Sequence, residues 1–222
     1  MMKISIFKYL TKIILSFFII IISCSNALAK EIRVVSLAPD LTEIIYSINA
    51  QNSLVGITTE CAKISDSKKI KKIGNSYFVN KEEILKLQPT HIFALSTTKP
   101  LLGGLNNSNI QIIYFDFKTI NDIYSAIEKI GKTLNKEKEA EKVITNIKNK
   151  ITNYKTKTPK RILYLVQTSP YITVGNKSYI TELITESGNI SVTKDLNYSY
   201  PSVSLEYIAK IADGGMRDAI TM

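Results

Sequence analysis

Side chains that commonly perform acid–base or nucleophilic chemistry are scarce in this sequence. The one histidine, His91, begins a predicted strand next to a Pro-Thr turn, which is typical of an ordinary strand-end residue. The sequence has no Gly-rich phosphate loop, no serine in an elbow motif and no His–acid pair suited to a triad. Zinc and manganese sites need several His and carboxylate ligands, so we expect no metal site. We therefore expect a protein that is not an enzyme and that needs no cofactor.

The first 29 residues have the pattern of a secretory signal peptide. Lys3, Lys8 and Lys12 precede an apolar run from Ile13 to Ile22, and residues 27–29 supply small side chains for a signal peptidase. A membrane span needs about 20 apolar residues, so a membrane anchor is the alternative that this shorter run favours less. We expect export to the periplasm, with residues 1–29 removed.

The two cysteines lead to two further expectations. The segment 22–25 resembles a lipoprotein processing site, so anchoring through a lipidated Cys24 is the alternative to cleavage after Ala29. Cleavage would leave Cys61 as the remaining thiol, and one thiol forms no intramolecular disulfide. We expect Cys61 to be a small buried apolar residue rather than a reactive thiol.

The distribution of charge argues against one class of partner. The chain carries a net charge of +10 at pH 7, and the lysines outside the leader are mixed with Glu and Asp. A surface for nucleic acid would need a basic block with interleaved aromatic residues, and the sequence has none. We therefore expect no nucleic-acid partner.

One long helix is expected to join two lobes. Apolar residues recur at steps of four and three from Lys136 to Thr156, which predicts one apolar stripe on a helix. The stripe comprises Ala140, Ile144, Ile147, Ile151 and Tyr154. Asn135 is expected to cap the start of this helix, and Pro159 to end it. Residues 133–158 are therefore assigned to the linking helix.

Before this helix, strands and helices alternate, which predicts parallel βαβ units. Apolar runs predict strands at 32–37, 54–57, 91–95 and 110–115, with an irregular polar stretch at 58–72. Periodic apolar residues predict helices at 41–48, from Asn80 to Pro89, and at 120–131. Residues 30–132 thus form a first α/β lobe, whose sites should lie at the carboxyl ends of the strands.

Residues 159–222 predict a second, smaller lobe. We expect strands at 161–166 and 171–175 and helices at 179–187 and 204–211, with Gly188 in a left-handed conformation after the first of these helices. Residues 212–219 have neither strand nor helix periodicity. The fold class is therefore α/β, with two parallel-sheet lobes joined by a long rigid helix. The second lobe is expected to be incomplete, with one or two strands.

Four segments resemble those of a known family. They are RVVSLAPDLTEI from Arg33, LVGIT from Leu54, NKEEILKLQPT from Asn80 and PSVSLE from Pro201. In this order they resemble the periplasmic solute-binding proteins of ABC transporters for vitamin B12, ferric siderophores and haem. The resemblance extends to about Ile211. It implies two α/β lobes with the ligand between them, and a monomer that delivers its ligand to an inner-membrane permease.

The resemblance also implies roles for particular residues. One surface glutamate of each lobe docks on the permease, and Glu82 and Glu206 occupy the matching positions. Such charges steer and register docking, although the helix dipole alone also favours first-turn glutamates. Large flat ligands are held mainly by apolar and aromatic walls. The residues expected to line the cleft are Pro39, Glu60, Tyr77, Phe78, Tyr171 and Tyr200.

The expected ligand is a B12-type corrinoid. Anionic siderophores are usually held by clusters of arginine, and the chain has three arginines, Arg33, Arg161 and Arg217. Haem, which a tyrosine can ligate, or a ferric siderophore is the alternative. A further alternative is a truncated, inactive relative, because the family's second lobe continues beyond the helix that contains Glu206. Such a chain would bind its ligand weakly or not at all.

Overall fold

The computed structural model describes residues 31–63, 69–105, 109–213 and 218–221. The expected signal peptide, with Cys24, lies outside this part of the chain, and so does Arg217. The chain divides into two units, Met1–Ile32 and Arg33–Met222, and the following description concerns the second. None of the helices within the described ranges is long and apolar enough to cross a membrane.

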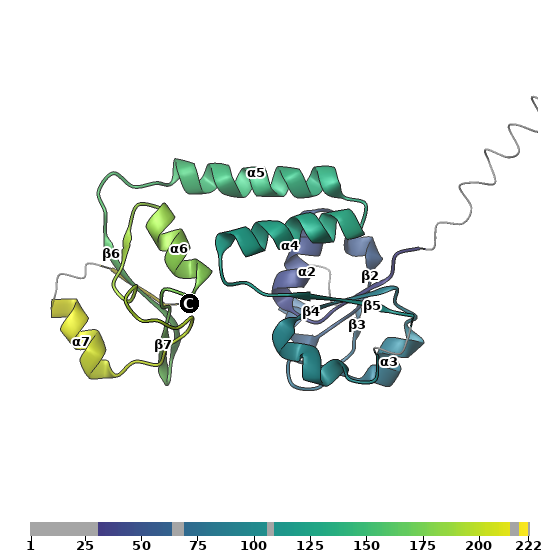
Figure 1. Cartoon of the computed structure of the whole chain (residues 1–222). Coiled ribbons are helices and arrows are strands. Elements are labelled where there is room, and N and C mark those ends of the chain that lie inside the picture. Colours follow the sequence, from purple (N-terminus) through teal and green to yellow (C-terminus); the bar gives the residue numbers. More distant parts are fainter. Residues whose placement is uncertain (1–30, 64–68, 106–108, 214–217, 222) are drawn as a thin grey trace, which may run out of the picture. The chain divides into compact units, whose positions relative to one another are not determined.

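The first lobe contains a five-stranded parallel sheet with the strand order β3-β2-β1-β4-β5 (Figure 1). Its strands are β1 (Val34–Ser36), β2 (Leu54–Ile57), β3 (Lys71–Lys72), β4 (His91–Leu95) and β5 (Gln111–Phe115). Its helices are α2 (Pro39–Ser47), α3 (Lys81–Lys86) and α4 (Ile120–Thr133), with shorter 3-10 helices η1 (Gln51–Ser53), η2 (Thr59–Lys63) and η4 (Ser96–Leu102). The predicted alternation of strands and helices is confirmed.

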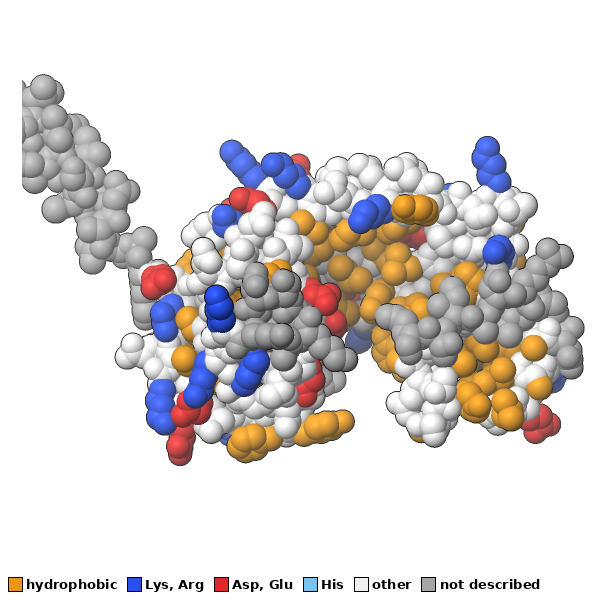
Figure 2. Space-filling view, turned by 180° about the vertical axis from the view of Figure 1, so that it is seen from behind, with side chains coloured by type: hydrophobic (Ala, Val, Ile, Leu, Met, Phe, Trp, Pro, Cys, Tyr) orange, Lys and Arg blue, Asp and Glu red, His pale blue; other side chains and the backbone are white. Residues whose placement is uncertain are grey.

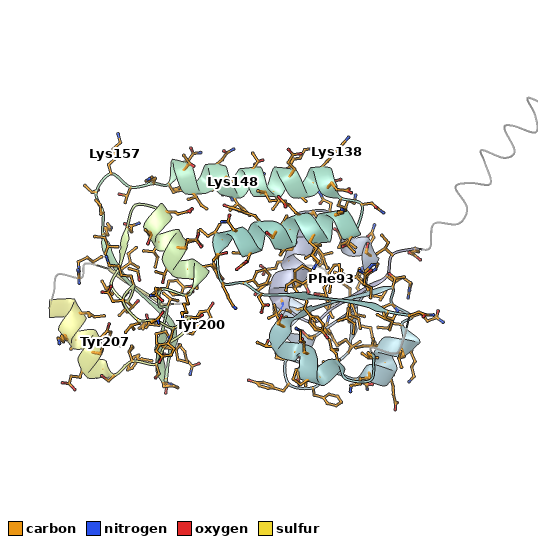
Figure 3. The ribbon with its side chains drawn as sticks, in the orientation of Figure 1. Phe93, Lys138, Lys148, Lys157, Tyr200 and Tyr207 are labelled. Carbon is orange, nitrogen blue, oxygen red and sulfur yellow. The ribbon has the colours of Figure 1, made fainter. Side chains whose placement is uncertain are left out.

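The strand β3 lies in the stretch that was expected to be irregular. It consists of two lysines, which carry no apolar pattern, and it forms because Gly56 and Ile57 of β2 offer a free edge for pairing. The other strands are apolar on both faces, as buried parallel strands must be. Phe93 in β4 is fully buried and meets Phe115 of β5 edge to face, with ring centroids 5.8 Å apart (Figure 3).

The second lobe contains a four-stranded mixed sheet around β6. Its strands are β6 (Arg161–Thr168), β7 (Tyr171–Thr173), β8 (Ile190–Ser191) and β9 (Asp218–Thr221), and its helices are α6 (Tyr179–Glu186) and α7 (Leu205–Asp213). The strands β8 and β9 run parallel to β6, whereas β7 is antiparallel to it. Four strands correct the expectation of one or two, because β8 and β9 are too short to show a period and are defined by pairing with β6.

The linking helix α5 (Glu137–Asn153) is shorter than predicted. Asn135 does not cap it, because this residue has a φ of 55° and forms the left-handed turn that follows α4. Tyr154 lies after the last helical residue and is 79 % exposed, so it does not continue the apolar stripe. Ala140 and Ile144 on the stripe are buried. Lys148 (Figure 3), one turn after Ile144, has its Nζ 5.0 Å from the centre of the Tyr124 ring in α4.

Candidate ligand-binding site

An aromatic turn lies between β3 and α3. Gly74 and Val79 form an antiparallel bridge at its base, and the Asn75 side-chain oxygen accepts hydrogen bonds from the backbone N–H groups of Tyr77 and Phe78, each at 2.9 Å. Tyr77 is 88 % exposed and Phe78 is 62 % exposed. The turn therefore holds two large aromatic side chains in water with a fixed backbone, and neither belongs to the core.

Glu60 lies beside the aromatic turn. Its Oε1 accepts a hydrogen bond from the Ser76 backbone N–H at 3.1 Å, while its Oε2 is buried and has no hydrogen-bond partner among the described residues. Partial burial alone would raise the pKa of this carboxyl, but the hydrogen bonds that it accepts, chiefly from Ser76, outweigh burial and lower its pKa. Glu60 is therefore ionised at neutral pH.

A buried hydroxyl–thiol cluster, formed by Ser36, Thr42, Thr58 and Cys61, supports this side of the site. Thr42 Oγ1 lies 2.8 Å from Ser36 Oγ and 3.2 Å from Cys61 Sγ, and Thr58 Oγ1 lies 3.3 Å from the same sulfur. All four side chains are fully buried, which confirms the prediction for Cys61. The cluster ties α2, which begins at Pro39, to the 3-10 helix η2, which contains Glu60.

Pro39 is the first residue of α2, at the carboxyl end of β1, and the next turn of α2 lines a cavity of about 300 Å³. Helices α2, α4, α5 and α6 form its mostly apolar walls, which include Asp40, Glu43, Ile44, Ile127, Ile147 and Tyr179. On the face shown in Figure 2, hydrophobic side chains gather in a hollow of the surface. A volume of this size is at the lower limit for drug-sized ligands, so the cavity cannot enclose a corrinoid.

Two of the predicted residues, Tyr171 and Tyr200, lie on neighbouring segments of the second lobe. The segment after Leu196 runs beside β7, because Gly175 N–H donates to Ser199 O at 3.1 Å and Thr173 N–H donates to Pro201 O at 3.0 Å. Tyr200 is 48 % exposed on this segment (Figure 3). Tyr171 begins β7, and its carbonyl oxygen accepts a hydrogen bond from the Val203 N–H at 3.0 Å.

The electrostatics connect these tyrosines with the first lobe. Burial raises the pKa of Tyr179, and the neighbouring Tyr200, Asp40 and Tyr164 raise it further. Burial and then Tyr200 raise the pKa of Tyr164. Desolvation by surrounding groups also raises the pKa of the Asp40 carboxyl. Asp40 at the start of α2 and Tyr179 at the start of α6 thus face each other across the two lobes.

The structure therefore brings the predicted residues together in two groups. Glu60, Tyr77 and Phe78 lie at one place in the first lobe, where Pro39 begins α2, while Tyr171 and Tyr200 lie on two paired segments of the second lobe. Sequence reasoning missed Asp40 and Tyr179, although Asp40 follows Pro39 directly at a strand end. The missed residues show no special spacing, because 139 residues separate them along the chain and tertiary packing alone makes them neighbours.

The two predicted docking glutamates are exposed, each in the first turn of its helix. Asn80 caps α3 by accepting the Glu83 N–H at 3.0 Å, and the Glu83 carboxylate binds two lysines. It lies 3.3 Å from Lys71 and 2.8 Å from Lys86, and no ion pair of Glu82 occurs among the described residues. The exposed Glu82 carboxylate is consequently available to a partner.

His91 is held in the sheet and points to no metal site. Its Nδ1 lies 2.8 Å from Thr90 Oγ1, and burial lowers the pKa of its imidazole. Within the described ranges, no three His, Cys, Asp or Glu side chains gather in a group that could hold a metal ion.

Comparison with known proteins places this fold among periplasmic binding proteins. A vitamin B12-binding protein of Pectobacterium atrosepticum is 27 % identical over 213 residues, which cover 89 % of this chain and 76 % of the relative. A high-affinity heme uptake system protein of Staphylococcus aureus is 26 % identical over 220 residues, which cover 93 % and 74 %. The crystal structure of the periplasmic heme binding protein HutB of Vibrio cholerae matches with a TM-score of 0.75 at 20 % identity, over 86 % of this chain and 76 % of that one.

The chain thus spans about three quarters of the length of each of these relatives. The structural likeness, at 20 % identity, establishes the fold, which is the predicted α/β architecture with a linking helix. The family model for periplasmic binding proteins matches residues 34–216, nearly the whole unit that contains both sheets. The chain therefore belongs to the family of periplasmic binding proteins.

Proposed function

We propose that this chain is the extracytoplasmic solute-binding component of an ABC importer and that it captures a B12-type corrinoid. It acts as a monomer in the periplasm, to which residues 1–29 direct it, with lipidation of Cys24 as the alternative route to the membrane surface. It passes its ligand to an inner-membrane permease and performs no catalysis. Haem is the second candidate ligand, since relatives named for both ligands match this chain.

The aromatic turn is the observation that carries this proposal. Burying a large aromatic side chain is worth about 1.5–3 kcal/mol, and the fold gains little of this from Tyr77, which is 88 % exposed, and only part of it from Phe78, which is 62 % exposed. An exposed aromatic pair on a fixed turn is typical of a surface that binds an apolar partner. A flat macrocycle stacked on the two rings would recover this free energy.

Glu60 favours a corrinoid over haem. The rim of a corrin carries neutral carboxamide groups, which an ionised carboxylate does not repel. Haem carries two propionates, which an ionised Glu60 would repel, and Asp40 and Glu43 on α2 add further negative charge. A corrinoid therefore avoids the charge repulsion that the propionates of haem would meet.

Titration calorimetry with cyanocobalamin and, separately, with hemin tests the ligand. For cyanocobalamin we expect binding by the full chain and a loss of affinity of about 10- to 100-fold in a Tyr77→Ala, Phe78→Ala double variant, since central aromatic contacts are worth about 1–3 kcal/mol. Tyr154→Ala is the matched control, because Tyr154 is equally exposed but lies at the end of α5. The control should bind like the parent.

Each other outcome has a definite meaning. If the chain binds hemin but not cyanocobalamin, the ligand is haem and not a corrinoid. No binding of either ligand by a folded chain would support the inactive relative. An equal loss of affinity in Tyr154→Ala would remove the aromatic turn from the site, whichever ligand binds.

We further propose that Glu82 and Glu206 contact the permease. Both are exposed first-turn residues, one in each lobe, and Glu82 forms no ion pair among the described residues. Glu82→Lys and Glu206→Lys should reduce uptake of labelled ligand by cells that express the importer, while the affinity for free ligand stays unchanged. Glu128→Lys, at an exposed position of α4, is the control and should leave uptake intact.

A further inference from the structure

A hydrogen bond joins the two lobes at the start of α4. Glu182 in α6 accepts the backbone N–H of Ile120 with its Oε2 at 2.7 Å, across 62 residues of sequence. Ile120 is the first residue of α4, and the first N–H groups of a helix have no acceptor within the helix. The second lobe therefore supplies an acceptor that the first helix turn lacks.

A capping box pairs three other N–H groups at the start of α4. Thr119 Oγ1 accepts the Asp122 N–H at 3.1 Å, and the Asp122 carboxylate accepts the N–H groups of Thr119 and Lys118 at 2.8 and 3.0 Å. This capping box leaves the Ile120 N–H for an acceptor from elsewhere. The capping box therefore cannot replace the bond between Glu182 and the Ile120 N–H.

Charge strengthens this contact. Glu182 lies in the first turn of α6 and also touches the first residue of α4, so one carboxylate faces the positive ends of two helix dipoles. Hydrogen bonds that an ionised carboxylate accepts are roughly twice as strong as neutral ones. Without the carboxylate, two helix N-termini with like partial charges would lie near each other.

The contact bears on the ligand site through α6. Tyr179 lies three residues before Glu182, on the same face of this helix, and lines the cavity together with Asp40 of the first lobe. We propose that Glu182 is a positioning residue that sets how the second lobe, with Tyr179 and Tyr200, faces the first. The effect on ligand affinity rests on the proposed function, whereas the effect on the lobe arrangement does not.

The matched control is Glu186, one turn further along α6. It is exposed, and it shares with Glu182 the proximity to Tyr124, whose pKa is raised by burial and then by these two carboxylates. The Ile120 N–H is bonded by Glu182 and not by Glu186. A difference between the two variants therefore isolates the hydrogen bond from the general charge of α6.

The test measures the distance between lobes by electron–electron double resonance in the full chain without ligand. Unnatural-amino-acid spin labels at the exposed positions Asn52 and Asp195 leave the native cysteines unchanged. We expect a broadened distribution in Glu182→Ala, an intermediate one in Glu182→Gln, which keeps a neutral acceptor, and the parent distribution in Glu186→Ala. Calorimetry with cyanocobalamin on the same variants should show a loss of affinity of about tenfold in Glu182→Ala, whereas Glu186→Ala should bind like the parent.

A distribution in Glu182→Ala that superimposes on that of the parent would overturn the proposal, as would equal broadening in Glu186→Ala. If Glu182→Ala does not fold, Glu182→Gln carries the same comparison. Failure of the parent to bind cyanocobalamin would count against the proposed function, but the distance measurement would still decide the role of Glu182.

Discussion

Replacement of Thr42 by valine tests whether the hydroxyl–thiol cluster holds the first-lobe side of the site together. Valine has nearly the shape of threonine, so the change removes a hydroxyl without opening a cavity. The hydroxyl lies 2.8 Å from Ser36 Oγ, 3.0 Å from the Ala38 carbonyl oxygen and 3.2 Å from Cys61 Sγ. The variant therefore removes the group at the centre of the cluster.

The expected cost follows from these contacts. A typical hydrogen bond contributes about 0.5–1.5 kcal/mol net, and a buried polar group that loses its partner costs about 1–3 kcal/mol. Because Thr42 and Ser36 are both fully buried, water cannot replace the lost contacts. We expect the free energy of unfolding to fall by about 2 kcal/mol and the melting temperature to fall by about 4–8 °C for a chain of this size.

Urea denaturation followed by far-ultraviolet circular dichroism measures this difference. Thr152→Val is the control, since the Thr152 hydroxyl donates to the Lys148 carbonyl oxygen at 3.0 Å on the exposed face of α5, where water can replace it. The control should change the unfolding free energy by less than about 0.5 kcal/mol. A Thr42→Val protein as stable as the parent, or a control that loses as much, would refute the reasoning.

Three further predictions concern single residues. Hydrogen bonds from the Thr119 backbone N–H and its neighbours lower the pKa of Asp122 in the folded state. The ionised carboxylate therefore stabilises the fold above the pKa of Asp122 in the unfolded chain, and this stabilisation is lost as the pH falls through the pKa in the folded state. The stability difference between parent and Asp122→Asn, about 1 kcal/mol at pH 7, should shrink below about pH 4 in denaturation curves; a constant difference would contradict this. Gly175→Ala would force a Cβ against the Tyr198 carbonyl oxygen and should cost more than about 2 kcal/mol of unfolding free energy, and a variant of parental stability would show that this contact relaxes. In a Cys24→Ser chain, the Cys61 thiol should react with a thiol reagent only on unfolding, whereas rapid labelling of the native protein would show Cys61 to be accessible.

The fold could be predicted where burial and sequence pattern coincide. The strands at 54–57 and 91–95 match β2 and β4 residue for residue, because strands buried on both faces must be continuous apolar runs. The strands β8 and β9 could not be predicted this way, since each exists through its pairing with β6. A strand defined by its partner leaves little trace in its own sequence.

The linking helix shows a different limit. The predicted burial of its apolar stripe is confirmed at Ala140 and Ile144. Asn135, however, forms the left-handed turn at the end of α4 and does not cap the start of α5. Asn favours both a helix cap and a left-handed turn, so its type alone does not choose between these roles. The tight connection between α4 and α5, in which Lys136 N–H donates to Gly131 O at 2.7 Å, decides for the turn.

The candidate site was predictable in its parts and not in its assembly. Tyr77 and Phe78 stand outside any periodic run, and this marks them as side chains without a place in the core. The facing of Asp40 and Tyr179, and the bond from Glu182 to Ile120, depend on how α6 packs near α2 and α4. Such contacts between distant segments follow from packing and have no local sequence signature.

A thermal melt of the full chain with and without excess cyanocobalamin tests the central claim most directly. A ligand that binds only the folded state adds about 2.7 kcal/mol of stability at 100 times its dissociation constant, so a cooperative melt should move upward by several degrees. We expect this shift with cyanocobalamin and a smaller one, or none, with hemin. A cooperative transition that cyanocobalamin leaves unmoved would contradict the claim that this protein captures a corrinoid.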